Sequence, residues 1–325
     1  MTRQGKFALA CAGAGVVALM AVRGALRNRR AISFEGRVVV ITGGSRGLGL
    51  VLARQLVAEG AKVCLLARDP EELDRARDQF PVDAEIMTLR CDIRRRADVR
   101  YAMNRLLDKW GAVDVLINNA GVIQVGPLEH MTEEDFERAM ATHFWGPLHL
   151  MYECVPSMRR RGFGRIVNIT SIGGRIAVPH LAPYSASKFA LVGLSDAVRS
   201  ELEQYGIRVT TVTPGLMRTG SPLNADFKGQ HELEYTWFAI SDSLPGITIS
   251  AERAARKIIE ACRYGEPELT ITWPARLAMR LNHLAPRLTA HALTLANKAL
   301  PGPAGNEGDR LKRGRQSETR WTESF

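Results

Sequence analysis

The stretch RVVVITGGSRGLG, residues 37–49, joins a β-branched run to a glycine-rich turn, and an apolar helical pattern follows it. Glycine lets the backbone turn tightly and lets another group approach it closely. The first turn of the following helix presents free N–H groups and the positive end of a helix dipole, which together favour a bound pyrophosphate. Because the turn lies between the first strand and the first helix, the sequence predicts a dinucleotide site rather than a purely structural turn.

Outward from this turn, residues 36–272 alternate between short apolar strands and helical patterns. The expected strands are 37–42, 61–67, 84–91, 113–121, 164–171, 206–215 and 267–272. The expected helices are 48–60, one that opens after Pro70, 97–111, 132–162 with proline and glycine interruptions, 184–205 and 251–265. This alternation predicts an α/β fold with a doubly wound, Rossmann-type parallel sheet that is covered on both faces.

The chain is expected to hold one such domain, over residues 36–272, between two different ends. An N-terminal segment, 1–35, contains an apolar helix. A basic helical extension, 273–301, follows the domain, and a polar, glycine-rich tail, 302–325, is expected to be disordered. The extension could lie on a membrane, cover the substrate entrance, form an oligomer contact or pack on the domain.

The apolar run at residues 7–22 has 16 residues without a charge. As a helix it would be about 24 Å long, which is short for a hydrocarbon core of about 30 Å. The basic residues Arg3 and Lys6 precede the run, and a heavier basic flank over 23–30 follows it. We interpret it as an uncleaved membrane anchor with the catalytic domain on the cytoplasmic side. A cleaved signal peptide and a helix lying in the interface are the alternatives.

The net charge of +10 is concentrated at the two ends of the chain, and the central part is close to neutral. This distribution favours a membrane lipid surface as a partner over nucleic acid. The five cysteines are scattered without a CxxC pair. Free thiols in a reducing compartment are therefore expected, with neither a disulfide framework nor a metal site.

Two further motifs accompany the glycine turn: NNAG at residues 118–121, and YSASK at 184–188 with Ser171 upstream. Together with the spacing Gly43-x3-Gly47-x-Gly49, they resemble the short-chain dehydrogenase/reductase family over residues 36–272. The resemblance implies a nicotinamide cofactor and the interconversion of a hydroxyl and a carbonyl group. The cofactor site that it implies comprises Gly43, Ser45, Gly47, Leu48, Gly49, Asp92, Ile93, Asn119, Ala120, Gly121, Tyr184, Lys188, Pro214, Gly215 and Thr219.

The catalytic residues implied by the resemblance are Ser171, Tyr184 and Lys188. Tyr184 and Lys188 are four residues apart, so they share a helix face. A nearby ammonium lowers the pKa of a phenol and makes Tyr184 a better proton donor and acceptor. His143 stands where the family usually has an asparagine that completes a proton relay. It could serve the relay with a changed pH profile, or it could be a packed core histidine.

The charges near the second strand favour NADPH over NADH. An NAD site uses a carboxylate at the end of this strand, whereas this chain has Ala67 followed by Arg68. With Arg46 in the glycine turn, two guanidinium groups would suit a 2′-phosphate, unless both are merely solvated surface residues. Asp69, one residue later, is a carboxylate and is the one signal that favours NADH instead.

The segment 216–250 corresponds to the family's substrate lid. Its apolar content predicts a small hydrophobic, lipid-like carbonyl substrate, unless these residues simply pack on the domain. The sequence therefore predicts an NADPH-dependent reductase of a ketone or aldehyde. An NAD-linked alcohol dehydrogenase and a catalytically silent nucleotide sensor or scaffold are the alternatives. The resemblance also leads us to expect a homo-oligomer.

Overall fold

Seven parallel strands form the central sheet of the computed structural model, in the order β11-β7-β6-β4-β1-β2-β3. The structure describes residues 22, 24–25, 27–218, 220–243 and 248–318. The strands are β1 (Val38–Thr42), β2 (Lys62–Ala67), β3 (Ile86–Arg90), β4 (Val115–Asn118), β6 (Gly164–Ile169), β7 (Ile207–Thr213) and β11 (Glu268–Thr270). All seven predicted strands are confirmed, each somewhat shorter than its apolar pattern.

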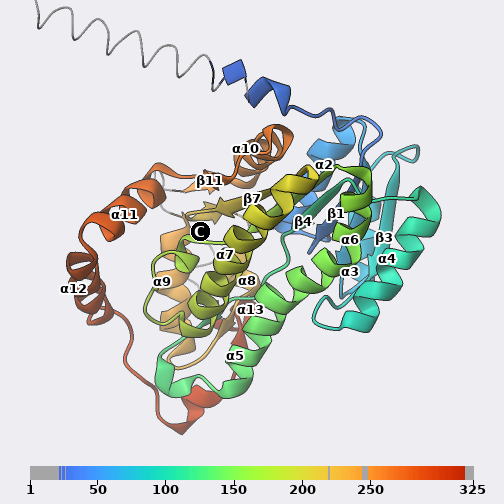
Figure 1. Ribbon diagram of the computed structural model, residues 1–325. Helices are drawn as coiled ribbons and strands as arrows, with labels where there is room; N and C mark the ends of the chain where they lie inside the picture. Colours follow the sequence, from blue (N-terminus) through green and yellow to red (C-terminus); the bar gives the residue numbers. More distant parts are fainter. Residues whose placement is uncertain (1–21, 23, 26, 219, 244–247, 319–325) are drawn as a thin grey trace, which may run out of the picture.

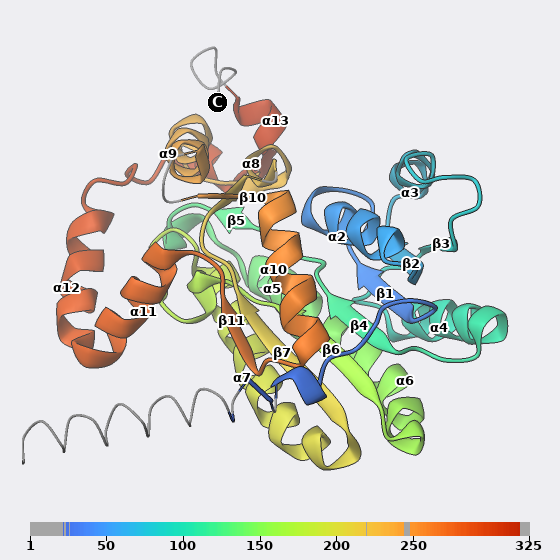
Figure 2. The same ribbon diagram turned by 90° about the horizontal axis from the view of Figure 1, so that it is seen from above.

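Helices cover both faces of this sheet, as Figure 2 shows from above. On one face lie α2 (Gly47–Ala58), α3 (Pro70–Arg77) and α10 (Ala251–Tyr264); on the other lie α4 (Arg96–Trp110), α6 (Gly146–Arg161) and α7 (Ala182–Leu202). Along β1, Val39 and Ile41 belong to the first apolar core, while Val38 and Val40 belong to the second. Because successive strand residues point to opposite faces, a continuous apolar run buries both sides. The doubly wound architecture is confirmed.

Strand β1 lies at the point where the chain changes direction across the sheet. Its neighbours are β2 on one side and β4 on the other, and Ile41 pairs with both Leu65 and Ile117. The three strands therefore end at the same level. In open parallel sheets a crevice forms at the carboxyl ends of the strands at such a switch point, and ligands bind there.

The helical segment predicted over 132–162, with proline and glycine interruptions, is interrupted directly before Gly146 and Pro147 by a π-helical turn. It consists of α5 (Glu133–Met140), a π-helical turn (Ala141–Trp145) and α6, and Pro156 lies inside α6. A π-helical turn widens the helix by one residue and is frequent at functional sites. His143 lies in this turn.

Short elements form a separate layer beyond the carboxyl ends of the strands. They are β5 (Gln124–Val125), β8 (Met217–Arg218), α8 (Ser221–Asn224), β9 (Asp226–Phe227), α9 (His231–Ser243) and β10 (Ile249–Ser250). Phe227 of β9 and Tyr235 of α9 anchor an apolar cluster of their own. The described part of the segment expected to be the substrate lid thus packs as a unit around this cluster.

The tail from residue 302 differs from the disorder expected for it. Residues Asn306–Asp309 form a 3₁₀ turn, Lys312–Arg313 form β12, and Gly314–Ser317 form α13. Strand β12 pairs antiparallel with β9, and Ser317 is fully buried. Sequence polarity misled here because backbone pairing with a lid strand orders this segment without a large apolar contribution of its own.

The basic extension forms two helices, α11 (Trp273–Leu284) and α12 (Pro286–Asn297), which project beside β11 at the margin of the molecule (Figure 1). Helix α11 buries Ala275, and every residue of α12, all of which the structure describes, is at least partly exposed. The predicted anchor at residues 7–22 lies outside the described residues, apart from Val22. Among the described residues, no helix combines the length and apolarity needed to cross a bilayer.

Candidate active site

Ser171 lies just beyond the end of β6, at the start of the 3₁₀ turn Ile172–Gly174. Its Oγ accepts a hydrogen bond from the Gly173 N–H at 3.0 Å. This bond holds the serine side chain in one orientation, and the hydroxyl hydrogen can still be donated to a substrate oxygen. The residue thus occupies the carboxyl edge of the sheet, where the switch-point crevice opens.

Tyr184 lies on the first turn of α7 and approaches Ser171 across a glycine. A Cβ added to Gly173 would lie 3.1 Å from Tyr184 Cε1 and 3.5 Å from Ser171 Oγ. The phenol ring and the serine hydroxyl therefore flank the same backbone position, which any larger residue would obstruct. The predicted grouping of Ser171 with Tyr184 is what the structure shows.

Lys188 lies one turn further along α7 and is 4% exposed. Its Nζ donates to the Ile169 carbonyl oxygen at 2.9 Å and lies 5.8 Å from the centroid of the Tyr184 ring. Burial disfavours the ammonium form and lowers the pKa of Lys188 to about 7. The amine is therefore held beside the phenol, and its charge is sensitive to pH near neutrality.

We expect kcat/KM for carbonyl reduction to fall as the pH rises above about 7, by about tenfold per unit. The pKa of Lys188 is lowered in the folded enzyme, so its ammonium is lost in the range where an exposed lysine would stay charged. The measurement is a pH–rate profile of the wild type and of Lys188→Arg, whose guanidinium keeps its charge. If the Lys188→Arg enzyme is active and its kcat/KM falls over the same pH range as that of the wild type, the alkaline limb belongs to another group.

His143 is completely buried beside these residues, and both of its ring nitrogens bind protein groups. Its Nε2 accepts from the Val122 N–H at 3.2 Å, which places the ring hydrogen on Nδ1. Nδ1 lies 2.7 Å from Ser187 Oγ and donates to it. Burial, and secondarily the charge of Lys188, lower the pKa of His143 well below its usual value.

A neutral His143 with this tautomer connects the loop after β4 to the start of α7. Its ring also meets the Tyr184 ring edge-on, with centroids 5.6 Å apart. Of the two roles that the sequence left open, the geometry favours a packed core histidine over a proton relay, because both ring nitrogens bind protein groups and neither is left to bind a bridging water. Ser187, which receives the Nδ1 hydrogen, was not singled out from the sequence. The sequence signal that could have indicated Ser187 is its position within the YSASK motif.

The glycine turn is closed by contacts that require the residues found there. A Cβ at Gly49 would lie 2.2 Å from the Gly43 carbonyl oxygen and 2.7 Å from Asn119 Nδ2. Asn119 Nδ2 in turn donates to the Thr42 carbonyl oxygen at 2.9 Å. Thr42 Oγ1 accepts from the backbone N–H groups of both Asn119 and Ala120, at 2.9 Å each. The two predicted cofactor motifs are thus one connected unit.

The start of α2 fits a pyrophosphate. Arg46 occupies the N-cap position, and because its guanidinium has no acceptor atom it leaves the helix N–H groups uncapped, while its side chain contacts Asn224 and Glu72. The N–H groups of the first turn, which includes Gly47, Leu48 and Gly49, can therefore bind an anion. Leu48 itself is 6% exposed and packs into the core. These features agree with the dinucleotide site predicted from the sequence.

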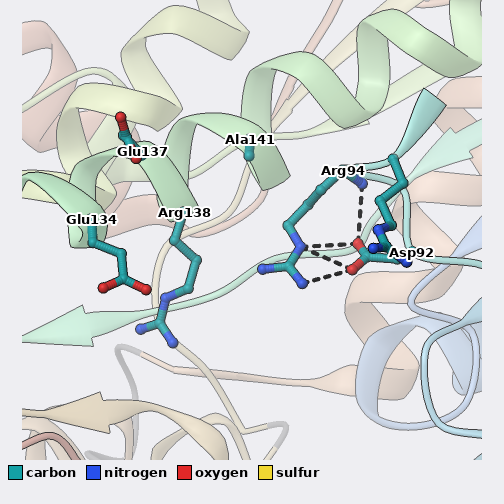
Figure 3. A pocket seen from close by; sticks show the side chains of 7 residues that line it. Asp92, Arg94, Glu134, Glu137, Arg138 and Ala141 are labelled. Atoms are coloured by element: carbon teal, nitrogen blue, oxygen red, sulfur yellow. Dashed lines mark hydrogen bonds and ion pairs between the residues drawn. The ribbon is translucent and has the colours of Figure 1, made fainter.

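Asp92 and Ile93 follow β3, as predicted, and Asp92 borders a cavity of about 330 Å³ between this loop and α5 (Figure 3). Burial alone would raise the pKa of Asp92, but hydrogen bonds from Arg94 outweigh it and lower the pKa. Arg94 Nη2 lies 2.6 Å from the carboxylate. Because a carboxylate has several lone pairs, an adenine amino group could bind beside Arg94.

Of the remaining predicted residues, Arg68, Pro214 and Gly215 follow the carboxyl ends of β2 and β7. Arg68 is exposed directly after β2. The Pro214 carbonyl oxygen, after β7, accepts from the Ile172 N–H at 2.8 Å and so joins the loop over 214–219 to the serine turn. Thr219 lies outside the described residues.

A family profile described as short chain dehydrogenase matches residues 37–227. The chain belongs to the short-chain dehydrogenase family. Dehydrogenase/reductase SDR family protein 7-like of Anopheles gambiae is 34% identical over 266 residues, which cover 80% of this chain and 82% of that one. The 3-ketodihydrosphingosine reductase of Bacteroides thetaiotaomicron is 36% identical over 201 residues, 61% of this chain and 71% of its own.

Solved structures of short-chain dehydrogenases agree with the cofactor site. A short-chain dehydrogenase/reductase from Burkholderia phymatum in complex with NAD is 27% identical, with a TM-score of 0.72 over 79% of this chain and 96% of that one. A short-chain dehydrogenase from Burkholderia cenocepacia in complex with NADP is 28% identical, with a TM-score of 0.65 over 80% and 98%. This short-chain dehydrogenase is therefore an oxidoreductase with a nicotinamide nucleotide as cofactor.

Proposed function

We propose that this short-chain dehydrogenase is an NADPH-dependent reductase of a ketone or aldehyde carbonyl on a hydrophobic, lipid-like substrate. The observation that carries the proposal is the apolar surface around the catalytic phenol. Tyr184 packs against the cluster formed by the lid and the loop after β4. Its other partly buried members are Ile123, Val178, Leu223, Trp237 and Phe238.

The cluster is suited to an acyl or alkyl chain because these members, which include Tyr184 itself, are only partly buried. Burying apolar area of a ligand against them contributes about 25 cal/mol per Å². Phe238 lies edge-on to both Phe227 and Trp237, so the aromatic wall is held in place by neighbouring rings. A polar substrate would gain little from these groups.

The polar residues of the site perform the proton chemistry. When bound, the reduced nicotinamide supplies the hydride. Ser171 donates a hydrogen bond to the substrate oxygen and orients it, and Tyr184 delivers the proton from its phenolic oxygen. Lys188 in its ammonium form stabilises the phenolate that remains. In the oxidising direction the same groups act in reverse, so an alcohol dehydrogenase activity uses the same site.

Two observations support NADPH as the preferred cofactor. Asp69, the opposing signal, is used as the N-cap of α3, where its Oδ1 accepts from the Glu71 and Glu72 N–H groups at 2.9 and 3.2 Å. A carboxylate committed to a helix cap is a poor acceptor for ribose hydroxyls. Arg46, which is half exposed, lies 3.6 Å from Glu72 and can exchange this partner for a phosphate.

The double substitution Arg46→Ala, Arg68→Ala is expected to lower kcat/KM with NADPH by at least about 100-fold, because each charge-assisted bond to a phosphate contributes about 1.5–3 kcal/mol and two are lost. The kcat/KM with NADH should change little. The matched control is Arg105→Ala on the exposed side of α4. Equal losses with both cofactors would show that the two arginines do not recognise a 2′-phosphate.

For the cellular setting, we propose association with a membrane through the apolar run at residues 7–22, with the catalytic domain on the cytoplasmic side. This rests on the basic residues that follow the run. Fusion of a glycosylation reporter to the C-terminus would test it, since modification of the reporter would place the domain on the opposite side.

The experiment that tests the activity follows NADPH oxidation by detergent-solubilised protein with a panel of carbonyl compounds. The panel includes 3-ketoacyl thioesters and 3-ketosphinganine, suggested by the name of the Bacteroides relative, as well as steroids, retinal and short ketones. Turnover that rises with chain length supports the proposal. Faster turnover of short polar ketones overturns the assignment of a lipid-like substrate. Tight NADPH binding without any turnover favours a sensor or scaffold.

A further inference from the structure

Helices α11 and α12 form a projecting pair, residues 273–297, which we name the α11–α12 hairpin. Both views show it beside the β11 edge, apart from the helices that cover the sheet (Figures 1 and 2). The two helices contact one another, and half-buried Ala285, Thr289 and Leu293 form one line along α12. The rest of α12 is exposed, so its apolar residues are not part of the enzyme core.

The exposed side of α11 carries a stripe of large apolar residues. Trp273 is 64% exposed, and Leu277, Leu281 and Leu284 are 48%, 49% and 83% exposed. Their spacing of i, i+4, i+8 and i+11 places them on one helix face. On α12, Leu288 and Leu295 share a face and are 68% and 65% exposed. Contiguous apolar surface of this kind marks an interaction site more often than scattered single residues do.

Basic residues flank each apolar stripe. Arg276, Arg280 and His283 lie beside the stripe of α11, and Arg287, His291 and Lys298 lie beside that of α12. All four Lys/Arg residues of this region are exposed, and residues 273–300 contain no Asp or Glu. Leucine and tryptophan bordered by basic residues are typical of helices that bind in the plane of an anionic membrane surface.

The hairpin is attached to the two loops that form the active site. A Cβ at Gly215, in the loop after β7, would lie 2.2 Å from Thr272 Oγ1 and 3.3 Å from Ala275 Cβ at the start of α11. Asn282 Nδ2 of α11 donates to the Arg175 carbonyl oxygen, directly after the serine turn, at 3.5 Å. A surface that binds the hairpin therefore lies next to the site entrance.

We propose that the α11–α12 hairpin docks this enzyme onto an anionic lipid bilayer, with its leucines in the interface and its arginines against the head groups. A second copy of the chain fits less well, because two such surfaces would bring like charges together without an acid in either hairpin. The proposal concerns where the protein binds, and it stands whether or not the substrate is a lipid.

The experiment uses the full chain in a Cys11→Ser background, labelled with an environment-sensitive fluorophore at Leu281→Cys or Leu288→Cys. The four remaining cysteines, Cys64, Cys91, Cys154 and Cys262, are buried. The control label is Val82→Cys, at a residue that is 97% exposed before β3. Because each label reports its own position, binding through residues 7–22 does not mimic binding by the hairpin.

Vesicles of phosphatidylcholine with phosphatidylserine should shift the emission of both hairpin labels to shorter wavelengths and leave the control label unchanged. The variant Arg276→Gln, Arg280→Gln, Arg287→Gln, Lys298→Gln should weaken this response at least tenfold in vesicle concentration, since each basic residue near an anionic surface contributes roughly fivefold. The matched control removes four exposed charges of the same sign from α4: Arg96→Gln, Arg100→Gln, Arg105→Gln, Lys109→Gln. It should bind as the wild type does.

Three results would overturn the proposal. The hairpin labels could stay unchanged while the protein floats with the vesicles, which would assign binding to another segment. They could respond to protein concentration without vesicles, which would identify the surface as a contact between copies. They could respond equally to vesicles of phosphatidylcholine alone, or equally in the two charge variants, and pairing between the hairpin's basic residues and anionic lipid would then have no role.

Discussion

Replacing Tyr184 by phenylalanine is expected to lower kcat/KM by at least about a thousandfold, since a positioned general acid contributes up to about 10⁴-fold. The substitution removes one oxygen atom and keeps the ring that packs beside Gly173 and against His143. A thousandfold loss corresponds to about 4 kcal/mol of transition-state stabilisation. The measurement is steady-state NADPH oxidation with the best substrate of the panel.

The same experiment needs two controls to make the loss interpretable. Tyr152→Phe alters an exposed tyrosine on α6, at 54% exposure, and should leave the rate unchanged. NADPH binding by the Tyr184→Phe variant, followed by fluorescence, should also remain within a few-fold of wild type. A variant that keeps a tenth or more of its activity would mean that a water or another side chain supplies the proton.

Substituting Gly49 by alanine is expected to weaken cofactor binding by about 10- to 100-fold. The added Cβ would lie 2.2 Å from the Gly43 carbonyl oxygen, closer than any real contact of this kind. Backbone or side-chain shifts forced by such overpacking cost about 1–3 kcal/mol, and here they displace the N–H groups that face the pyrophosphate. Titration with NADPH and thermal unfolding with and without NADPH would measure both effects.

A matched glycine is available inside a helix of the same domain. Gly193 of α7 has open space around the position of a Cβ, so Gly193→Ala should bind NADPH normally and be as stable as the wild type or slightly more so. If Gly49→Ala bound NADPH as tightly as Gly193→Ala does, the turn would not be the pyrophosphate site.

Much of the fold was predictable because the signals are local. Each of the seven strands is a short β-branched or apolar run bounded by glycine, proline or polar residues, and the glycine turn lies between the first strand and α2. Local geometry also relates Tyr184 to Lys188, since residues four apart share a helix face. The grouping with Ser171 came from a family resemblance, and the structure shows the physical contact through Gly173.

The structure departs from the sequence analysis where long-range contacts decide the outcome. The tail at residues 306–318 looked too polar to fold, yet His130 binds Asp309 at 2.8 Å and β12 pairs with β9. The lid is held by a similar contact, in which His180 and Trp237 both bind the buried carboxylate of Glu234 at 2.7 Å. His130 and Asp309, like His180 and Glu234, are far apart in sequence, so no local pattern reveals these pairs, whereas Trp237 and Glu234 are neighbours on α9.

The sequence by itself determined the alternating parallel sheet, the glycine turn before α2 and the shared helix face of Tyr184 and Lys188, because strand pattern, turn chemistry and helix periodicity act over a few residues. The catalytic role of these two residues came from the family resemblance. The tertiary structure decided the roles that depend on surroundings. Burial lowers the pKa of Lys188 to about 7. Bonds to Val122 and Ser187 make His143 a neutral, packed core histidine. The position of α11 and α12 at the margin of the molecule leaves their leucines exposed. Burial and exposure depend on which distant elements pack together, and that information is not contained in any single stretch of the chain.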